Sequence, residues 1–349
     1  MKKTIVLVYS VIHLAVDMSC AILVSNLLAQ RADGSYSLFG AVVLYDFAAF
    51  VLQLPFGMLA DKLNKNALVS AVGCVLVAAA YGFAAHGVIA CIIAGIGNAL
   101  FHVGGGIDVL NISEGRAAPS GIYVSTGALG LFLGMKSAAF GFQRYFAVVL
   151  LLLLCFAALQ WLYVKVKGSV RNVPFSVQAL SGSAWLAVLC LMLTVCLRSY
   201  VGMILAFEWK SRLPLGFAAI VGVVLGKMLG GVIGDKIGYL KTAVLSLGLA
   251  AVLFLFAFDV PAVGIAAILL FNMTMPLTLT LLADIFSGAR GMAFGLLTVA
   301  LFVGAVPKFY GVTALFTPWG LFALTAASAV ILSAGILLHR KARRENDAA

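Results

Sequence analysis

The chain has 349 residues, of which 64% are hydrophobic and only 10% are charged. An ordinary soluble domain is about half apolar and about a quarter charged, so a soluble fold could not bury this much apolar surface. The formal net charge of +11 is spread over many short polar segments, which excludes a compact basic domain that binds nucleic acid. These properties predict an all-α membrane protein.

About twelve apolar runs are long enough to cross a bilayer, for which a helix needs about 20 residues. The first run follows Lys2 and Lys3 and is longer than a signal-peptide core, so we expect it to be a retained first span. The first half is predicted to span the membrane at 4–30, 36–60, 67–86, 88–111, 119–141 and 145–166. The second half is predicted to span it at 184–207, 216–235, 240–258, 261–284, 290–308 and 317–339.

The longest polar stretch between spans is 167–183, and it predicts a linker between two domains. The first domain would be a six-helix bundle over 1–166. The second would be a six-helix bundle over 184–349 that ends in a short basic tail. Short connections leave no room for a further soluble domain.

The two halves repeat each other at one gapless offset of 174 residues. The identities along this offset are Gly57 with Gly231, Asp61 with Asp235, Lys62 with Lys236, Asn98 with Asn272, Arg116 with Arg290, Gly121 with Gly295 and Gly130 with Gly304. Several of these residue types are rare in apolar helices, so chance does not explain the match. A six-span internal repeat is typical of transporters that bind their substrate at the repeat interface.

The lysines and arginines predict the orientation of the chain in the membrane. With both termini on one side, the loops and tails of that side hold fifteen of these residues and the opposite loops hold five. Because loops rich in Lys and Arg stay in the cytoplasm, both termini are predicted to be cytoplasmic in a multi-pass protein of the cell membrane.

The loops after the second and eighth predicted spans carry the same motif. Each resembles the G-x-x-x-D-[RK]-x-G-[RK] signature of the major facilitator superfamily, and Asn64 stands at the first copy's glycine position. Asn tolerates a left-handed backbone, so the turn can form without the glycine. The resemblance implies the major facilitator fold and secondary transport. It also implies a cytoplasmic gating motif formed by Gly57, Asp61, Lys62, Gly231, Asp235 and Lys236.

A second resemblance is to the fosmidomycin-resistance branch of that superfamily. It rests on His13 and Asp17 in the first span and on Asn98 and His102 in the fourth, although Val103 stands where that branch has proline. It implies export of a drug or a small anion.

Polar groups inside predicted spans are candidates for function, because a charge at the bilayer centre costs about 2.5–3.5 kcal/mol on insertion scales. His13 and Asp17 are four residues apart and share a helical face. We hypothesise that they carry protons and that Arg198 is a counter-ion or an anion site, while static structural partnerships stay open for each. The candidate substrate and proton pathway is His13, Asp17, Asp46, Asn98, His102, Lys136, Arg198, Lys227 and Asn272. Asp108 and Asp284, at span ends, are expected to be solvated.

The sequence contains no recognisable enzyme, metal-ligand or nucleotide motif, so we expect neither catalysis nor a cofactor or metal. The six cysteines lie in apolar runs without CxxC spacing and are expected to be buried thiols. The favoured function is a proton-coupled secondary transporter that exports a drug or organic anion and works as a monomer. The alternatives are an uptake carrier for a small metabolite and a membrane sensor that does not transport.

Overall fold

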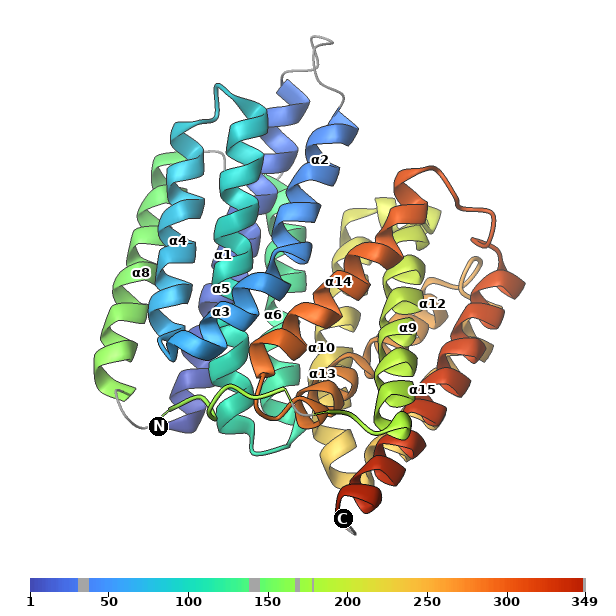
Figure 1. Ribbon diagram of the computed structural model, residues 1–349. Helices are drawn as coiled ribbons and strands as arrows, with labels where there is room; N and C mark the ends of the chain where they lie inside the picture. Colours follow the sequence, from blue (N-terminus) through green and yellow to red (C-terminus); the bar gives the residue numbers. More distant parts are fainter. Residues whose placement is uncertain (31–37, 138–144, 167–169, 178, 348–349) are drawn as a thin grey trace. The chain divides into compact units, whose positions relative to one another are not determined.

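The computed structural model describes residues 1–30, 38–137, 145–166, 170–177 and 179–347, and the regular structure in these ranges is entirely helical (Figure 1). In this part of the chain, ten helices are long and apolar enough to cross a membrane. Two further apolar helices, Asn66–Gly82 and Tyr239–Phe254, are shorter. Together they make twelve, which confirms the predicted all-helical membrane architecture.

The first half contains one interrupted span. Its helices are α1 (Lys2–Gln30), α2 (Leu38–Asp46), the π-helix η1 (Phe47–Val51), α3 (Gln53–Leu63), α4 (Asn66–Gly82), α5 (Gly87–Ser113), α6 (Ala117–Met135) and α8 (Tyr145–Val166). The second predicted span consists of α2, η1 and α3, with α3 continuing after a bend (Figure 1). A π-turn inside a helix is rare and bends the axis, which hydrophobic periodicity does not predict.

The second half also contains an interrupted span. Its helices are α9 (Gly182–Ile204), the 3₁₀-helix η2 (Glu208–Ser211), α10 (Leu213–Ile237), α11 (Tyr239–Phe254), α12 (Pro261–Asn272), α13 (Met275–Ile285), α14 (Arg290–Phe309) and α15 (Pro318–Asp347). The tenth predicted span is divided into α12 and α13, because Pro276 has no N–H for the carbonyl of Asn272. α15 continues through the segment that we predicted to be a basic tail.

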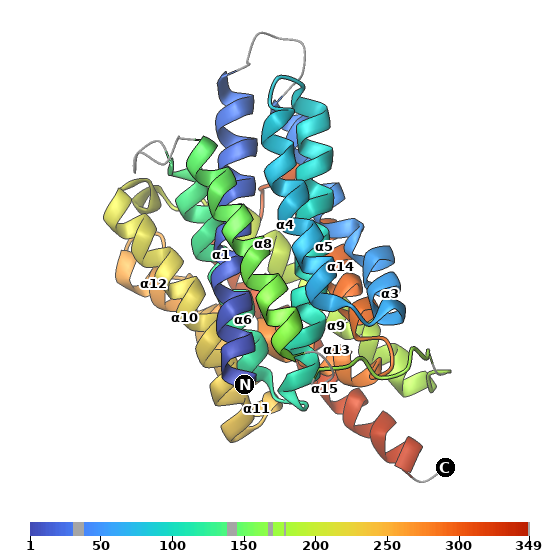
Figure 2. The same cartoon turned by 90° about the vertical axis from the view of Figure 1, so that its left-hand side faces the viewer.

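The chain groups into two compact units. The first comprises Met1–Glu114, Tyr123–Phe175 and Gly288–Val299, and the second comprises Gly115–Ile122, Ser176–Ser287 and Ala300–Ala349. Within the first, α4 packs on α5 and α8, and α1 packs on α5 and α8, so that these four helices lie side by side (Figure 2). Within the second, α15 packs on α9 and α11, and α10 packs on α12. The predicted domain boundary at 167–183 stays a prediction.

Glycines allow the close approach of α4 and α5 that supports the site described below. A Cβ placed on Gly73 would lie 2.5 Å from the carbonyl oxygen of Gly97 and from the backbone nitrogen of Phe101. A Cβ on Gly97 would lie 2.8 Å from the carbonyl oxygen of Gly73. Both obstacles are backbone, which cannot move aside as a flexible side chain can. The α4–α5 contact therefore requires these two glycines.

Gly73→Ala is expected to lower the thermal stability of the purified protein, because the added methyl forces α4 and α5 apart at a cost of about 1–3 kcal/mol. The matched control is Gly82→Ala at the end of α4, where a Cβ would meet nothing within 4 Å. Thermal unfolding followed by tryptophan fluorescence in detergent measures both variants. Equal melting temperatures for Gly73→Ala and the wild type would contradict the packing argument.

Candidate functional site

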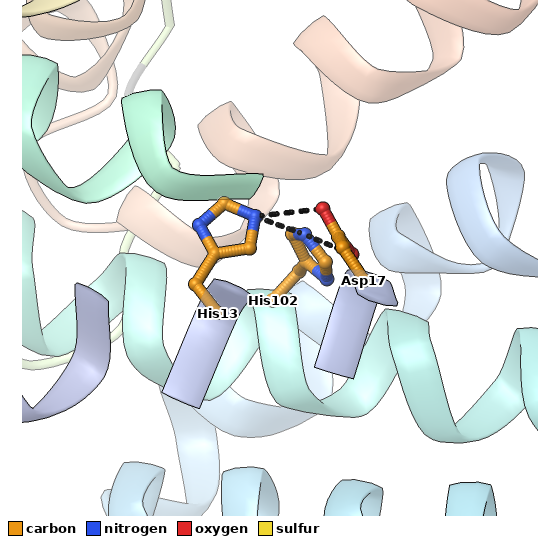
Figure 3. A group of neighbouring side chains, drawn as sticks. All are labelled: His13, Asp17 and His102. Atoms are coloured by element: carbon orange, nitrogen blue, oxygen red, sulfur yellow. Dashed lines mark hydrogen bonds and ion pairs between the residues drawn. The ribbon is translucent and has the colours of Figure 1, made fainter. Parts of the chain in front are cut away.

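Two helices of the first unit bring four predicted residues together. α1 carries His13 and Asp17, and α5 carries Asn98 and His102. Each pair is spaced by four residues, which places its members on one helical face. Because α1 packs on α5, the two faces meet, and both imidazoles point toward the carboxylate of Asp17 (Figure 3). We call His13, Asp17 and His102 the cation cluster.

The distances within the cation cluster are those of direct contacts. Nε2 of His13 lies 2.8 Å from Nε2 of His102 and 3.2 Å from Oδ2 of Asp17. Nε2 of His102 lies 3.5 Å from Oδ1 of Asp17. The side-chain amide of Asn98 donates to the same Oδ1 at 3.0 Å. The three donor atoms therefore converge on one small volume.

The hydrogen-bond partners of the two Nδ1 atoms indicate which ring nitrogen of each histidine carries the proton. Nδ1 of His13 lies 2.8 Å from the carbonyl oxygen of Tyr123, and Nδ1 of His102 lies 2.9 Å from the carbonyl oxygen of Asn98. A carbonyl oxygen only accepts hydrogen bonds, so each Nδ1 carries a proton. Without a further cation, two Nε2 lone pairs would then face each other and a carboxylate. A proton shared between the imidazoles would make one imidazolium and so would balance the charge of Asp17.

The surroundings of the cation cluster are tightly packed but not closed. The side chains of His13, His102 and Asp17 are 6%, 13% and 19% exposed. Gly127 on α6 has its Cα against Nε2 of His13 and Oδ2 of Asp17, because a Cβ there would overlap both atoms. Its missing side chain therefore leaves the space in which the cluster converges. The cluster is therefore not fully enclosed.

A chain of hydrogen bonds follows α5 away from the cation cluster. The hydroxyl of Tyr9 and the side-chain amide of Asn66 donate to the two oxygens of Asp108, each at 2.7 Å. Asp108 is only 4% exposed, which corrects our expectation that it is solvated. A carboxylate needs such donors when it is buried. The ring of Tyr9 also meets that of Tyr123 edge to face, with centroids 6.4 Å apart.

The same chain continues into the polar segment after α8. The amide nitrogens of Asn66 and Asn111 donate to the side-chain oxygen of Asn172 at 2.7 and 2.9 Å. The side-chain amide of Asn172 donates to the carbonyl oxygens of Ala60 and Asp61 at the end of α3. Asn172 thus adds hydrogen bonds to carbonyls in the last turn of α3, where the Ala60 carbonyl also accepts from the backbone nitrogen of Asn64.

The first motif aspartate receives hydrogen bonds from the start of another helix. In the first unit, Asp61 accepts from the backbone nitrogens of Gly291 and Met292, at 2.8 and 3.0 Å, at the N-terminus of α14. Nη1 of Arg290 is 2.8 Å from Oδ1 of Asn111 and so joins this end of α14 to the asparagine chain. A carboxylate at a helix N-terminus both satisfies N–H groups and complements the helix dipole.

The second motif aspartate makes the same contact in the second unit. Asp235 accepts from the backbone nitrogens of Ala117 and Ala118, at 2.8 and 2.9 Å, at the N-terminus of α6. Under the repeat offset of 174 residues, Asp61 corresponds to Asp235, and Ala117 corresponds to Gly291. The two contacts are therefore the same pair of positions with the repeats exchanged. We call them the aspartate latches.

Glycines permit the close approach at both latches. Gly57 lies against Gly291, where a Cβ on Gly291 would be 2.5 Å from the carbonyl oxygen of Gly57. Gly231 lies against Ala117, whose carbonyl oxygen would be 2.6 Å from a Cβ on Gly231. The motif lysines are exposed, and Nζ of Lys62 lies 4.9 Å from the ring centroid of Phe175. Asn64 adopts the left-handed conformation, with φ of 51°, whereas Gly238 in the second copy has φ of 93° and a different backbone conformation.

The remaining predicted pathway residues do not join the cation cluster. Arg198 on α9 is buried in the second unit, where Nη1 donates to Oγ1 of Thr278 on α13 at 3.2 Å. Asn272 uses its side-chain amide within its own helix, donating to the carbonyl oxygen of Ile268. Lys227, on α10, is half-buried in the same unit. These residues belong to a unit separate from the cluster.

Asp46 and Lys136 are also placed apart from the cluster. Asp46 is half-buried at the end of α2, directly before the π-helix, and Lys136 is exposed just beyond α6. Asp284, expected to be solvated, is 37% exposed and pairs with Nε2 of His339 at 2.8 Å. That expectation is therefore only partly met.

Sequence reasoning missed the residues that orient the site. The backbone carbonyl of Tyr123 and the bare Cα of Gly127 have no chemical signature in sequence. Asn172 falls in the predicted linker, where a polar residue is unremarkable. The repeated glycines could be recognised in the sequence, but the helices that they contact could not. A constant offset shows which positions are equivalent and does not show which positions touch.

Comparison with known proteins shows the fold. No family model matches the sequence, and no characterised protein matches it by sequence. The structure of the human organic anion transporter MFSD10 (TETRAN) matches with a TM-score of 0.68 and 15% identity, over 97% of this chain and 99% of that chain. A bacterial homologue of the iron transporter ferroportin, in an outward-facing state, matches with 0.68 and 15%, over 99% and 100%.

A third similar structure is the E. coli fucose:proton symporter FucP, with a TM-score of 0.59 and 13% identity over 96% of this chain and 98% of that chain. FucP is described as a transporter of the major facilitator superfamily. The chain therefore has the major facilitator fold, as the motif predicted.

Asp61→Ala and Asp235→Ala should each destabilise the protein by about 0.5–2 kcal/mol, the usual cost of removing a helix N-terminal acceptor. Because the two latches belong to different units and share no hydrogen-bond partner among the described residues, their losses should add. Asp259→Ala, at an exposed turn, is the matched control. Thermal unfolding of both single variants and the double variant tests this. A double variant no less stable than either single one would rule out independent latches.

Proposed function

We propose that this protein is a secondary transporter that works by alternating access. The pair of aspartate latches carries this proposal. Each is a helix N-terminus held by two charge-assisted hydrogen bonds, and the two are equivalent under the internal repeat. A protein that opens alternately needs contacts that hold one state yet release at modest cost. Polar helix-end contacts meet that need better than continuous apolar packing.

We further propose that transport is coupled to protons through the cation cluster. His13, His102 and Asp17 together require one extra positive charge, and a shared proton supplies it. The other groups that face the cluster are Asn98, the ring of Tyr123, whose centroid lies 4.8 Å from that of His13, and Cys20, whose Sγ lies 3.7 Å from the Asn98 amide. Loss of the proton would leave lone pairs in contact, so the cluster would rearrange. Tyr9, Asp108 and the asparagines connect this region to the latch at Asp61, which gives such a rearrangement a route to the latch.

For cargo and direction, export of a drug or organic anion is the first candidate. The buried guanidinium of Arg198 suits an anion, since it has five N–H donors and one hydrogen bond to Thr278. MFSD10, a similar fold, is an organic anion transporter. Uptake of a small metabolite is the second candidate, and a membrane sensor that does not transport is the third. The protein would act as a monomer in the cell membrane, with both termini in the cytoplasm and no enzymatic activity.

The substrate can be found by a growth screen that compares null and overexpressing cells across toxic compounds and carbon sources. Inside-out vesicles from the same cells, with a pH-sensitive dye and a metal chelator, then report proton movement when a screened compound is added. We expect Asp17→Asn to abolish this movement, because the amide cannot balance the imidazolium. Asp259→Asn should leave it unchanged.

Coupled flux that survives in Asp17→Asn would refute the proton assignment. Saturable binding of the compound without flux in the wild type would refute transport and favour the sensor.

A further inference from the structure

The cation cluster has the donor set of a transition-metal site. Two imidazole nitrogens and one carboxylate oxygen lie within 4.8 Å of one another, and all three come from buried or half-buried residues. Two histidines with one carboxylate form a common ligand set for divalent iron, cobalt, nickel and zinc. Magnesium and calcium prefer oxygen ligands and suit this set poorly. His13 and Asp17 are four residues apart, but His102 lies far along the chain, so no local spacing indicates the full set of three ligands.

The distances between the donor atoms fit a metal ion. Zinc binds nitrogen and oxygen at about 2.0–2.2 Å, so adjacent ligand atoms of a tetrahedral site are about 3.3 Å apart. In the cluster the two Nε2 atoms are 2.8 Å apart, Nε2 of His13 is 3.2 Å from Oδ2 of Asp17, and Nε2 of His102 is 3.5 Å from Oδ1 of the same carboxylate. The contact between the two Nε2 atoms must widen by about half an ångström, and the carboxylate must turn so that one oxygen faces both nitrogens. An ion can therefore enter through small side-chain rotations.

The outer contacts are those that metal sites require. A metal-binding histidine donates its other N–H to a carbonyl or carboxylate, which fixes the tautomer and aims the free nitrogen at the metal. Here Nδ1 of His13 and Nδ1 of His102 are both tied to backbone carbonyl oxygens. The amide of Asn98 holds the carboxylate of Asp17. All three ligands are therefore oriented before any ion arrives.

We propose that Nε2 of His13, Nε2 of His102 and the carboxylate of Asp17 bind a divalent first-row transition-metal ion in place of the shared proton. Three protein ligands leave a fourth position open, as in sites that exchange ligands with solvent. Binding releases the shared proton, so the cluster changes from neutral to a net charge of +1. The site does not depend on the transport proposal, because binding requires no flux.

The test uses the full-length protein in detergent, purified by a tag without histidine, with cobalt(II) or zinc(II) chloride as the only added ligand. Calorimetry should give one ion per chain, and cobalt should develop the visible absorption of a low-coordinate complex. A weakly buffered sample should release about one proton per ion bound. Zinc should raise the melting temperature of the wild type, while magnesium should not.

Variants identify the ligands. His13→Ala, His102→Ala and Asp17→Asn should each weaken binding by at least tenfold. Gly127→Ala should also weaken it, because its methyl would occupy the space beside His13 and Asp17 while all three ligands remain. His86→Ala and His339→Ala, the chain's other two histidines, are matched controls and should bind like the wild type. Asp17→Glu, which keeps a carboxylate, should retain binding if it folds.

No saturable binding or zinc-induced stabilisation in the wild type would overturn the proposal. Binding that persists in folded His13→Ala and His102→Ala would overturn it as well. The vesicle assay above contains a chelator, so its outcome concerns protons alone. Failure of metal binding and failure of proton-coupled transport are therefore distinguishable.

Discussion

The fixed tautomers of two histidines are the constraint on which the site depends. Because both Nδ1 atoms are committed to carbonyl oxygens, the Nε2 atoms can approach each other only around a cation. The features that bring the two Nε2 atoms together are therefore part of the site. The list includes the four-residue spacing on α1 and α5, the packing of α5 on α4 through glycine, and the bare backbone of Gly127 on α6. A helix bundle without those glycines could carry the same ionisable residues and still not bring them together.

The aspartate latches illustrate how a duplicated sequence produces a reciprocal structure. The motif in each repeat holds the start of a helix from the other repeat, so α6 and α14 have their N-termini satisfied by the partner sequence. Asp61 is buried and Asp235 is exposed and also accepts from the Tyr239 hydroxyl, so the two copies differ in environment despite equivalent backbone hydrogen bonds. Equivalent contacts with unequal burial would release at unequal cost. That difference gives the two latches distinct strengths within one symmetric plan.

Sequence reasoning predicted the fold well, because hydrophobic run length and a repeated motif are direct consequences of the bilayer and of duplication. It also identified His13, Asp17, Asn98 and His102, since polar residues in apolar helices are conspicuous. It did not predict that they meet, because helix rotation depends on packing that a single sequence does not encode locally. Asp108 was misread for the same reason: its position near a span end indicated solvent, whereas Tyr9 and Asn66 enclose it. The break between α12 and α13 was not predicted, although Pro276 lies beside it.

Asn172 makes the polar segment after α8 more than a covalent link between the two repeats. A flexible tether would only keep two halves at high local concentration, and two separately expressed halves could replace it. Here one side chain of that connection bonds to the end of α3, to Asn66 and to Asn111. A split protein cut beside this residue would therefore lose an ordered structural part along with the covalent link. The segment around Asn172 is therefore a structural part of the first unit.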